Sequence, residues 1–242
     1  MTLARSPLVL AAMLSLAPMT PQAQSYDCSV DAMLVFDGSG SMAEISFDTG
    51  AATRIDEARA AITRAMPQIT PFRDVGLVIY GPGGASSCTG IDVRFPPARD
   101  AAIEIITEVN GLRPDGLTPL TASVERAAEV LNYRQEPAVV VLVTDGNETC
   151  GGTPCALGER MAAEARDLTV HVIGFRVVVD FFSWNSPEQD PLSTTVSRCL
   201  ADETGGLFVS TETVDELVDA LNATLGCPVI GHARPNDAKT RS

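Results

Sequence analysis

Five oxygen-bearing side chains in three separate segments are the best candidates for chemistry: Asp37, Ser39, Ser41, Thr118 and Asp145. They offer carboxylate and hydroxyl oxygens and neither sulfur nor imidazole. Such a ligand set suits a small hard cation, Mg²⁺ or Mn²⁺. Three hydroxyls, two carboxylates and water can satisfy a near-octahedral ion. We expect one coordination position to stay open for an outside ligand, most naturally an acidic side chain.

Each segment taken alone also has an ordinary structural explanation. Asp-Gly-Ser-Gly-Ser is typical of a flexible turn, Thr118-Pro119 of a capped helix start, and Asp145-Gly146 of a turn. The segments occur together, however, and each follows an apolar run or stands at the start of a helical pattern. That combination favours a metal site.

The segments that must position these residues alternate between strand and helix patterns. Apolar runs predict strands at residues 32–36, 75–80, 138–143, 169–175 and 207–210, and residues 91–95 alternate like an edge strand. Helical spacing predicts helices at residues 54–66 (ended by Pro67), 100–110, 120–133, 156–167, 193–203 and 214–225.

This alternation predicts an α/β fold, a doubly wound and mostly parallel central sheet with helices on both faces. In such sheets ligands bind at the carboxyl ends of the strands, near the switch point where the connections diverge. If the strands that precede Asp37 and Asp145 are neighbours, both carboxylates project into one crevice.

The two ends of the chain differ from its middle. Residues 1–25 predict a signal peptide, with a positive start, an apolar stretch too short to span a bilayer, and small residues at 23–25 for cleavage. An uncleaved membrane anchor is the alternative. We expect one domain over residues 26–227 and a disordered polar tail over residues 228–242. No later segment is apolar enough to cross a membrane, so we expect a periplasmic or secreted protein.

The charge of the chain limits its partners. With 31 acidic and 17 basic residues, the formal net charge is −14. Binding to phosphates needs clustered Lys and Arg, so we expect no nucleic-acid partner. The sequence leaves the oligomeric state open.

Six cysteines in an exported chain predict disulfides rather than metal thiolates. Cys150 and Cys155 are close enough in sequence to close a small loop. Cys28 precedes the first expected strand and Cys227 follows the last expected helix, so that pair would tie the ends of the domain together. The pairing of the other two stays open: Cys88 and Cys199. A zinc site is the alternative, although the chain has only two histidines.

The five oxygen-bearing residues, in this order, resemble the metal-ion-dependent adhesion site of von Willebrand factor type A domains. The resemblance covers about residues 28–227. Thr204-Gly205-Gly206 and the cysteines around Glu148 are similar to exported bacterial members. The resemblance implies hydroxyl contacts to the metal from Ser39, Ser41 and Thr118, and contacts from Asp37 and Asp145 made directly or through water.

The same resemblance implies a mostly parallel sheet with one short antiparallel edge strand, which residues 91–95 would form. It also implies a protein-binding module that is not an enzyme. Two segments depart from the family pattern. Residues 43–53 lengthen the path to the first helix, and residues 177–191 carry three aromatic side chains. Those aromatics either form an exposed partner site or fold back on the domain.

We therefore expect an exported adhesion or scaffold module that holds Mg²⁺ (or Mn²⁺) and engages a carboxylate of a protein partner. One alternative is a metal-assisted hydrolase, with Glu148 or Glu44 as its base. Another is a structural envelope protein in which the metal only stiffens the loops. His171 lies within an expected strand, where a packed core histidine is the simpler interpretation.

Overall fold

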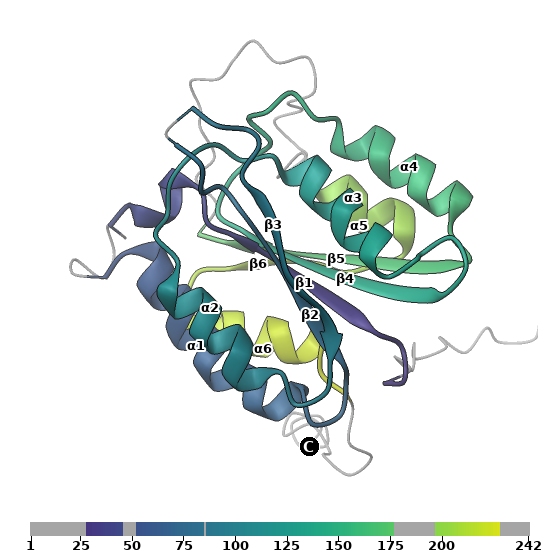
Figure 1. Cartoon of the computed structure of the whole chain (residues 1–242), viewed down its shortest axis with the longest axis horizontal. Helices are drawn as coiled ribbons and strands as arrows, with labels where there is room; N and C mark the ends of the chain where they lie inside the picture. The colour runs from purple at the N-terminus through teal and green to yellow at the C-terminus, as the bar shows by residue number, and fades with distance from the viewer. Residues whose placement is uncertain (1–27, 46–51, 85, 177–196, 228–242) are drawn as a thin grey trace, which may run out of the picture.

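A six-stranded sheet forms the centre of the computed structural model, which describes residues 28–45, 52–84, 86–176 and 197–227. The strand order is β3-β2-β1-β4-β5-β6 (Figure 1). The strands are β1 (Ala32–Asp37), β2 (Val75–Tyr80), β3 (Ile91–Ala98), β4 (Pro137–Thr144), β5 (Asp167–Phe175) and β6 (Phe208–Thr211). Only the β2–β3 pair is antiparallel. The predicted fold class, with its antiparallel edge strand, is confirmed.

Helices cover both faces of the sheet. One face is covered by α1 (Arg54–Ile69), α2 (Ala102–Gly111) and α6 (Val214–Thr224), and the other by α3 (Leu120–Val130), α4 (Pro154–Glu164) and α5 (Arg198–Thr204) (Figure 1). Alternate side chains of β1 enter the two cores: Leu34 and Phe36 pack on one face, and Met33 and Val35 on the other. A continuous apolar run is what a strand buried on both faces requires.

Several helix boundaries differ from the sequence prediction by a few residues; α3, for example, ends at Val130 and not at residue 133. Pro67 does not end α1, which continues to Ile69. Pro67 lies in the last turn, and the buried Met66 and Ile69 hold that turn against the core. Asp167 begins β5 instead of ending a helix, because the chain is already extended at Ala165.

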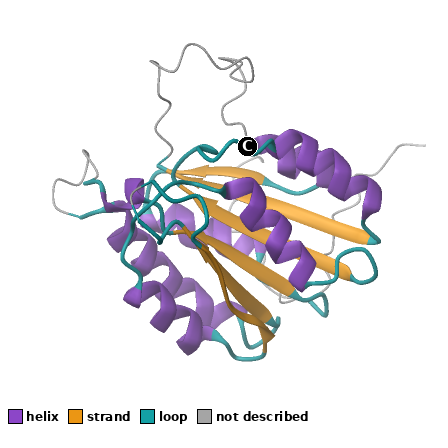
Figure 2. Cartoon of the chain, turned by 45° about the horizontal axis from the view of Figure 1, so that its top comes forward, coloured by secondary structure: helices purple, strands orange, loops and turns teal. Residues whose placement is uncertain are grey.

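The carboxyl end of the sheet gathers the loops of interest (Figure 2). The chain crosses to β2 on one side of β1 and returns as β4 on the other, so the switch point lies between β1 and β4. Gly116 has a φ of +73° and Gly81 a φ of +113°. A Cβ on Gly116 would overlap the carbonyl oxygen of Gly81. Glycine therefore allows these loops to approach each other at backbone distance.

All six cysteines form disulfides. The predicted Cys28–Cys227 bond is confirmed. The predicted Cys150–Cys155 bond is wrong: Cys150 pairs with Cys88, and Cys155 with Cys199. Cys155 lies in the first turn of α4, so the helix fixes its direction towards α5 despite the short sequence separation from Cys150.

Several predictions concern residues outside the described ranges: the signal segment, the polar tail and the aromatic segment at 177–191. Within the described ranges, no helix is both long enough and apolar enough to cross a bilayer.

Candidate metal centre

The loop after β1 turns its side chains inward through local hydrogen bonds. Asp37 is the last residue of β1, and its Oδ1 accepts the backbone N–H of Ser39 at 2.8 Å. The short 3₁₀ helix η1 (Gly40–Ala43) follows. It brings the Ser39 and Ser41 hydroxyl oxygens to 3.0 Å from each other. The two-residue spacing of these serines therefore places both hydroxyls on the same side of the loop.

Asp145 meets this loop from the neighbouring strand. It follows β4 directly, and β4 pairs in parallel with β1. The Ser41 hydroxyl donates to Asp145 Oδ1 at 2.7 Å. Two residues 104 positions apart in the sequence are thus in direct contact at the switch point.

The second oxygen of Asp37 is held by a chain of hydroxyls. Thr144 Oγ1 donates to Asp37 Oδ2 at 2.7 Å and accepts from the buried Tyr80 phenol at 3.1 Å. Burial, and then the negative charge of Asp37, raise the pKa of Tyr80 well above its usual value. Tyr80 therefore stays protonated as a donor. Sequence reasoning missed both residues, although Thr144 stands directly before Asp145 in the Thr-Asp-Gly segment.

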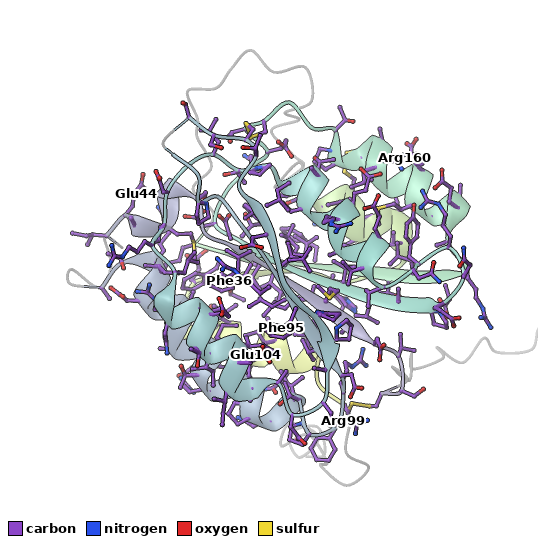
Figure 3. All side chains as sticks on the ribbon, in the orientation of Figure 1. Phe36, Glu44, Phe95, Arg99, Glu104 and Arg160 are labelled. Atoms are coloured by element: carbon purple, nitrogen blue, oxygen red, sulfur yellow. A yellow bond between two sulfur atoms is a disulfide. The ribbon has the colours of Figure 1, made fainter. Side chains whose placement is uncertain are left out.

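Arg54, at the start of α1, supplies a positive charge beside the two carboxylates. Its Nη1 lies 3.0 Å from each of three acceptors: Asp145 Oδ2, the Ser41 carbonyl oxygen and Glu44 Oε2. Arg54 and Asp145 are buried, whereas the Glu44 side chain is mostly exposed at the loop end of the molecule (Figure 3). The sequence offered no signal for this contact, because Arg54 reads only as a first-turn helix residue.

Asp145 is the group most strongly affected by these surroundings. Burial, and then the negative charge of Asp37, raise the pKa of Asp145 to about 7, although Ser41 and Arg54 act in the opposite direction. A bound divalent cation would offset both the burial of Asp145 and its repulsion by Asp37, since a cation favours the ionised carboxylate.

Thr118 lies in the third loop, between α2 and α3, and is buried. This loop contacts the loop after β1 (residues 38–43, the serine loop) through two backbone hydrogen bonds. Gly40 N–H donates to the Gly116 carbonyl at 3.1 Å, and Asp115 N–H donates to the Gly38 carbonyl at 3.0 Å. The structure thus places Thr118 two residues from a direct contact with the serine loop.

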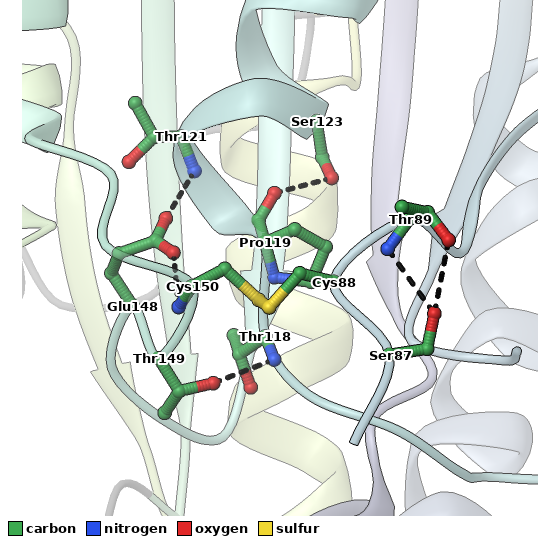
Figure 4. Close-up of a disulfide and its surroundings, with 10 residues drawn as sticks. All are labelled: Ser87, Cys88, Thr89, Thr118, Pro119, Thr121, Ser123, Glu148, Thr149 and Cys150. Atoms are coloured by element: carbon green, nitrogen blue, oxygen red, sulfur yellow. Dashed lines mark hydrogen bonds between the residues drawn. A yellow bond between two sulfur atoms is a disulfide. The ribbon is translucent and has the colours of Figure 1, made fainter. Parts of the chain in front are cut away.

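Glu148 and Glu44, the two bases considered for a hydrolase, both already have hydrogen-bond partners. Glu148 accepts the backbone N–H of Thr121 and that of Cys150, each at 2.8 Å, which caps the start of α3 (Figure 4). Glu44 pairs with Arg54. The cap of α3 therefore comes from Glu148, and the helix does not depend on the Thr118 hydroxyl for it.

The donor set fits a hard cation better than a soft one. Within the described part of the chain, no group of three or more His, Cys, Asp or Glu side chains could hold a metal ion by itself. Every cysteine is oxidised to a disulfide, so thiolate ligands for zinc are absent. What remains at the switch point is two carboxylates and neighbouring hydroxyls, which are ligands for Mg²⁺ or Mn²⁺.

Residues 32–148 match the family model described as von Willebrand factor type A domain. Among curated proteins, the chain is 27% identical over 197 residues to the uncharacterized protein YwmD of Bacillus subtilis, covering 77% of this chain and 81% of that protein.

Two solved structures share the fold. The pilus adhesin SpaC of Lactobacillus rhamnosus GG aligns with a TM-score of 0.59 at 16% identity, over 83% of this chain and 30% of that one. The manganese-loaded TRAP protein of Plasmodium vivax aligns with a TM-score of 0.52 at 15% identity, over 82% of this chain and 74% of that one. The family model thus covers just under half of the chain, and the two structures show that the fold is shared over about four fifths of it.

Proposed function

We infer that the chain forms a domain of the von Willebrand factor A type. We propose that it works as an exported, cation-dependent protein-binding module and is not an enzyme. We propose that Ser39, Ser41 and Thr118 hold Mg²⁺ or Mn²⁺ through their hydroxyls, with Asp37 and Asp145 contributing directly or through water. The bound cation would supply an open coordination position for a carboxylate of the partner protein. The partner is thus a protein that presents an acidic side chain.

One observation carries this proposal: Ser39, Ser41 and Asp145 form a continuous chain of oxygen atoms at 3.0 and 2.7 Å, at the switch point of the sheet. Hydroxyls and carboxylates that are already oriented cost little to reorganise around an ion. Asp37 has both of its oxygens engaged, by Ser39 and Thr144. This arrangement suits a contact through water better than a direct one.

The relatives point in the same direction. One solved structure with this fold is a pilus adhesin and another holds manganese, according to their descriptions. The three disulfides support a protein that works in an oxidising compartment, periplasmic or secreted. Hydrolysis is less favoured, because Glu148 caps α3 and Glu44 pairs with Arg54.

Calorimetric titration of Mg²⁺ and Mn²⁺ tests the metal site. We expect the wild type to bind and the Asp37→Ala, Ser39→Ala double variant to lose at least about tenfold in affinity, since it lacks one carboxylate and one ligand hydroxyl. Equal affinities in the two proteins would exclude the site.

The binding role needs a separate measurement. We expect protein partners captured from an extracellular extract to be retained in Mg²⁺, released by EDTA, and lost with Ser41→Ala. Retention that persists in EDTA while the melting temperature falls would instead favour a structural role for the metal. Ester or phosphoester turnover that disappears with EDTA would favour the hydrolase.

A further inference from the structure

The Cys88–Cys150 disulfide joins the two loops that lie on either side of the Thr118 loop (Figure 4). Each cysteine stands next to a residue that holds this loop. The Ser87 carbonyl accepts the Leu117 N–H at 3.2 Å. Thr149 Oγ1 accepts the Thr118 N–H at 2.8 Å, and the Thr149 N–H donates to the Thr118 carbonyl at 3.1 Å.

These contacts matter because the segment between α2 and α3 forms no helix or strand of its own. Among the described residues, Gly116 and Asp115 form its backbone hydrogen bonds to the loop after β1, and Asp115 Oδ2 accepts the N–H of Gly84 from the loop after β2. The position of Thr118 therefore depends on hydrogen bonds between loops. Thr149 is an exposed residue, and a single hydrogen bond such as the one from the Thr118 N–H to its hydroxyl contributes only about 1 kcal/mol to stability.

A covalent link between the two flanking loops strengthens this arrangement. Cys88 and Cys150 are 62 residues apart in sequence, and their Cα atoms lie 5.6 Å apart. The disulfide bond between them excludes conformations in which the two loops separate. Ser87 and Thr149 are then held on opposite sides of Thr118, and the three hydrogen bonds form together.

We propose that the Cys88–Cys150 disulfide and Thr149 are positioning groups for the cation site. They hold Thr118 where its hydroxyl can bind the cation together with the hydroxyls of Ser39 and Ser41. The inference rests on the proposed metal-binding function, and it makes cation affinity depend on one particular disulfide. Neither cysteine touches the ion.

Cys155–Cys199 provides a matched control. It joins the first turn of α4 to the second residue of α5, on the helical layer that covers one face of the sheet. It closes a comparable separation of 44 residues, but it links two helices and not the loops that flank Thr118. Its removal reports the general cost of losing a disulfide.

The experiment compares Cys88→Ser, Cys150→Ser with Cys155→Ser, Cys199→Ser by Mn²⁺ and Mg²⁺ calorimetry and by thermal unfolding in EDTA. We expect both double variants to melt at lower temperature. Only the first should lose cation affinity, by about tenfold, as is typical when groups that orient metal ligands are removed. Equal affinity in the first variant and the wild type would overturn the inference and leave the proposed function standing.

A second pair of variants keeps the test decisive if the first double variant does not fold. Thr149→Val removes the acceptor for the Thr118 N–H and retains the disulfide, whereas Thr149→Ser retains both. We expect weakened cation binding in Thr149→Val and wild-type binding in Thr149→Ser. A Thr149→Val variant with wild-type affinity would contradict the role of this residue.

Hydrogen exchange in EDTA gives a reading that does not need the ion. The Leu117 and Thr118 amides should exchange faster in the Cys88, Cys150 variant and in Thr149→Val. Their exchange rates should stay at the wild-type values in the Cys155, Cys199 variant. Unchanged exchange in all variants would contradict the positioning role. If the wild type binds no cation, the proposed function fails, and the exchange rates alone decide whether the disulfide holds the loop.

Discussion

Arg54 shows how a single residue balances the charge of the site. Its guanidinium contacts Asp145, and the negative charge of Asp37 acts on the same buried carboxyl. Replacing Arg54 by methionine would leave buried carboxylates without their positive neighbour. We expect Arg54→Met to lower the free energy of unfolding in EDTA by about 3 kcal/mol, at the lower end for a broken buried pair because Asp145 can take up a proton. Urea unfolding measures this difference.

Arg64→Met is the control for Arg54→Met. Arg64 lies on the same helix, but its pair with Asp215 is exposed on both sides. Exposed pairs contribute less than about 1 kcal/mol. If the two variants lose the same stability, Arg54 acts as an ordinary surface residue and the charge balance described here is wrong.

His171 gives the fold a pH dependence from within the sheet. It is buried in β5, and its Nδ1 accepts the Leu207 N–H at 3.0 Å. Burial, and then the charge of Arg73, lower the pKa of His171 to about 4. Between about pH 6.5 and pH 4, His171 therefore binds a proton in the unfolded chain but not in the folded one. The stability that His171 contributes is full above pH 6.5 and is lost as the pH falls towards 4.

We expect wild type to lose about 2 kcal/mol more than His171→Asn between about pH 7.5 and pH 5, from about 1.4 kcal/mol per pH unit. Asparagine keeps an acceptor for Leu207 and removes the titration. Urea unfolding in EDTA at both pH values measures the difference, in which the contributions of other groups cancel. Parallel losses in the two proteins would refute the assignment.

At the scale of elements, the close approach of the Thr118 loop to the loop after β2 depends on glycine. Gly116 has a positive φ, and a Cβ there would overlap the Gly81 carbonyl oxygen. We expect Gly116→Ala to cost more than about 1 kcal/mol of stability and to weaken cation binding, because the Thr118 loop must move away. Thermal unfolding and Mn²⁺ titration measure the two effects.

Gly205→Ala is the control that introduces backbone strain at a positive φ without a steric overlap of its Cβ. Gly205 has a φ of +70° at the end of α5, and its Cβ would meet nothing within 4 Å. It should lose about 1 kcal/mol of stability and keep wild-type cation affinity. Weaker cation binding in this variant too would show that the Gly116 effect is not local to the loops.

The elements themselves could be predicted because each strand is a continuous apolar or alternating run. The strands before Asp37 and Asp145 were evident for that reason, and their carboxyl ends had to lie at one edge of a parallel sheet. Arg54 and Tyr80 could not be predicted, because their contacts are set by how α1 and β2 pack. Sequence proximity also misassigned Cys155, since the direction of a helical side chain depends on the helix.

At the scale of the whole molecule, the Cys28–Cys227 disulfide joins the two ends of the described domain. It lies beyond the amino end of β1, at the opposite edge from Asp37. We expect Cys28→Ser, Cys227→Ser to lose about 2–4 kcal/mol, because the bond restricts the unfolded chain. Cation affinity should stay at the wild-type value.

Denaturant unfolding and calorimetry test this prediction together. A loss of cation affinity comparable to that of the Cys88, Cys150 variant would mean that any disulfide controls the site through global stability. The distinction proposed between the two ends of the sheet would then be incorrect.

The most direct test of the account is a crystal structure grown with Mn²⁺, with the ion located by its anomalous scattering. We predict a peak at the carboxyl ends of β1 and β4, within bonding distance of the Ser39, Ser41 and Thr118 hydroxyls and beside Asp145. A peak only at other sites, or none at millimolar Mn²⁺, would contradict the claim that these three loops form a cation site.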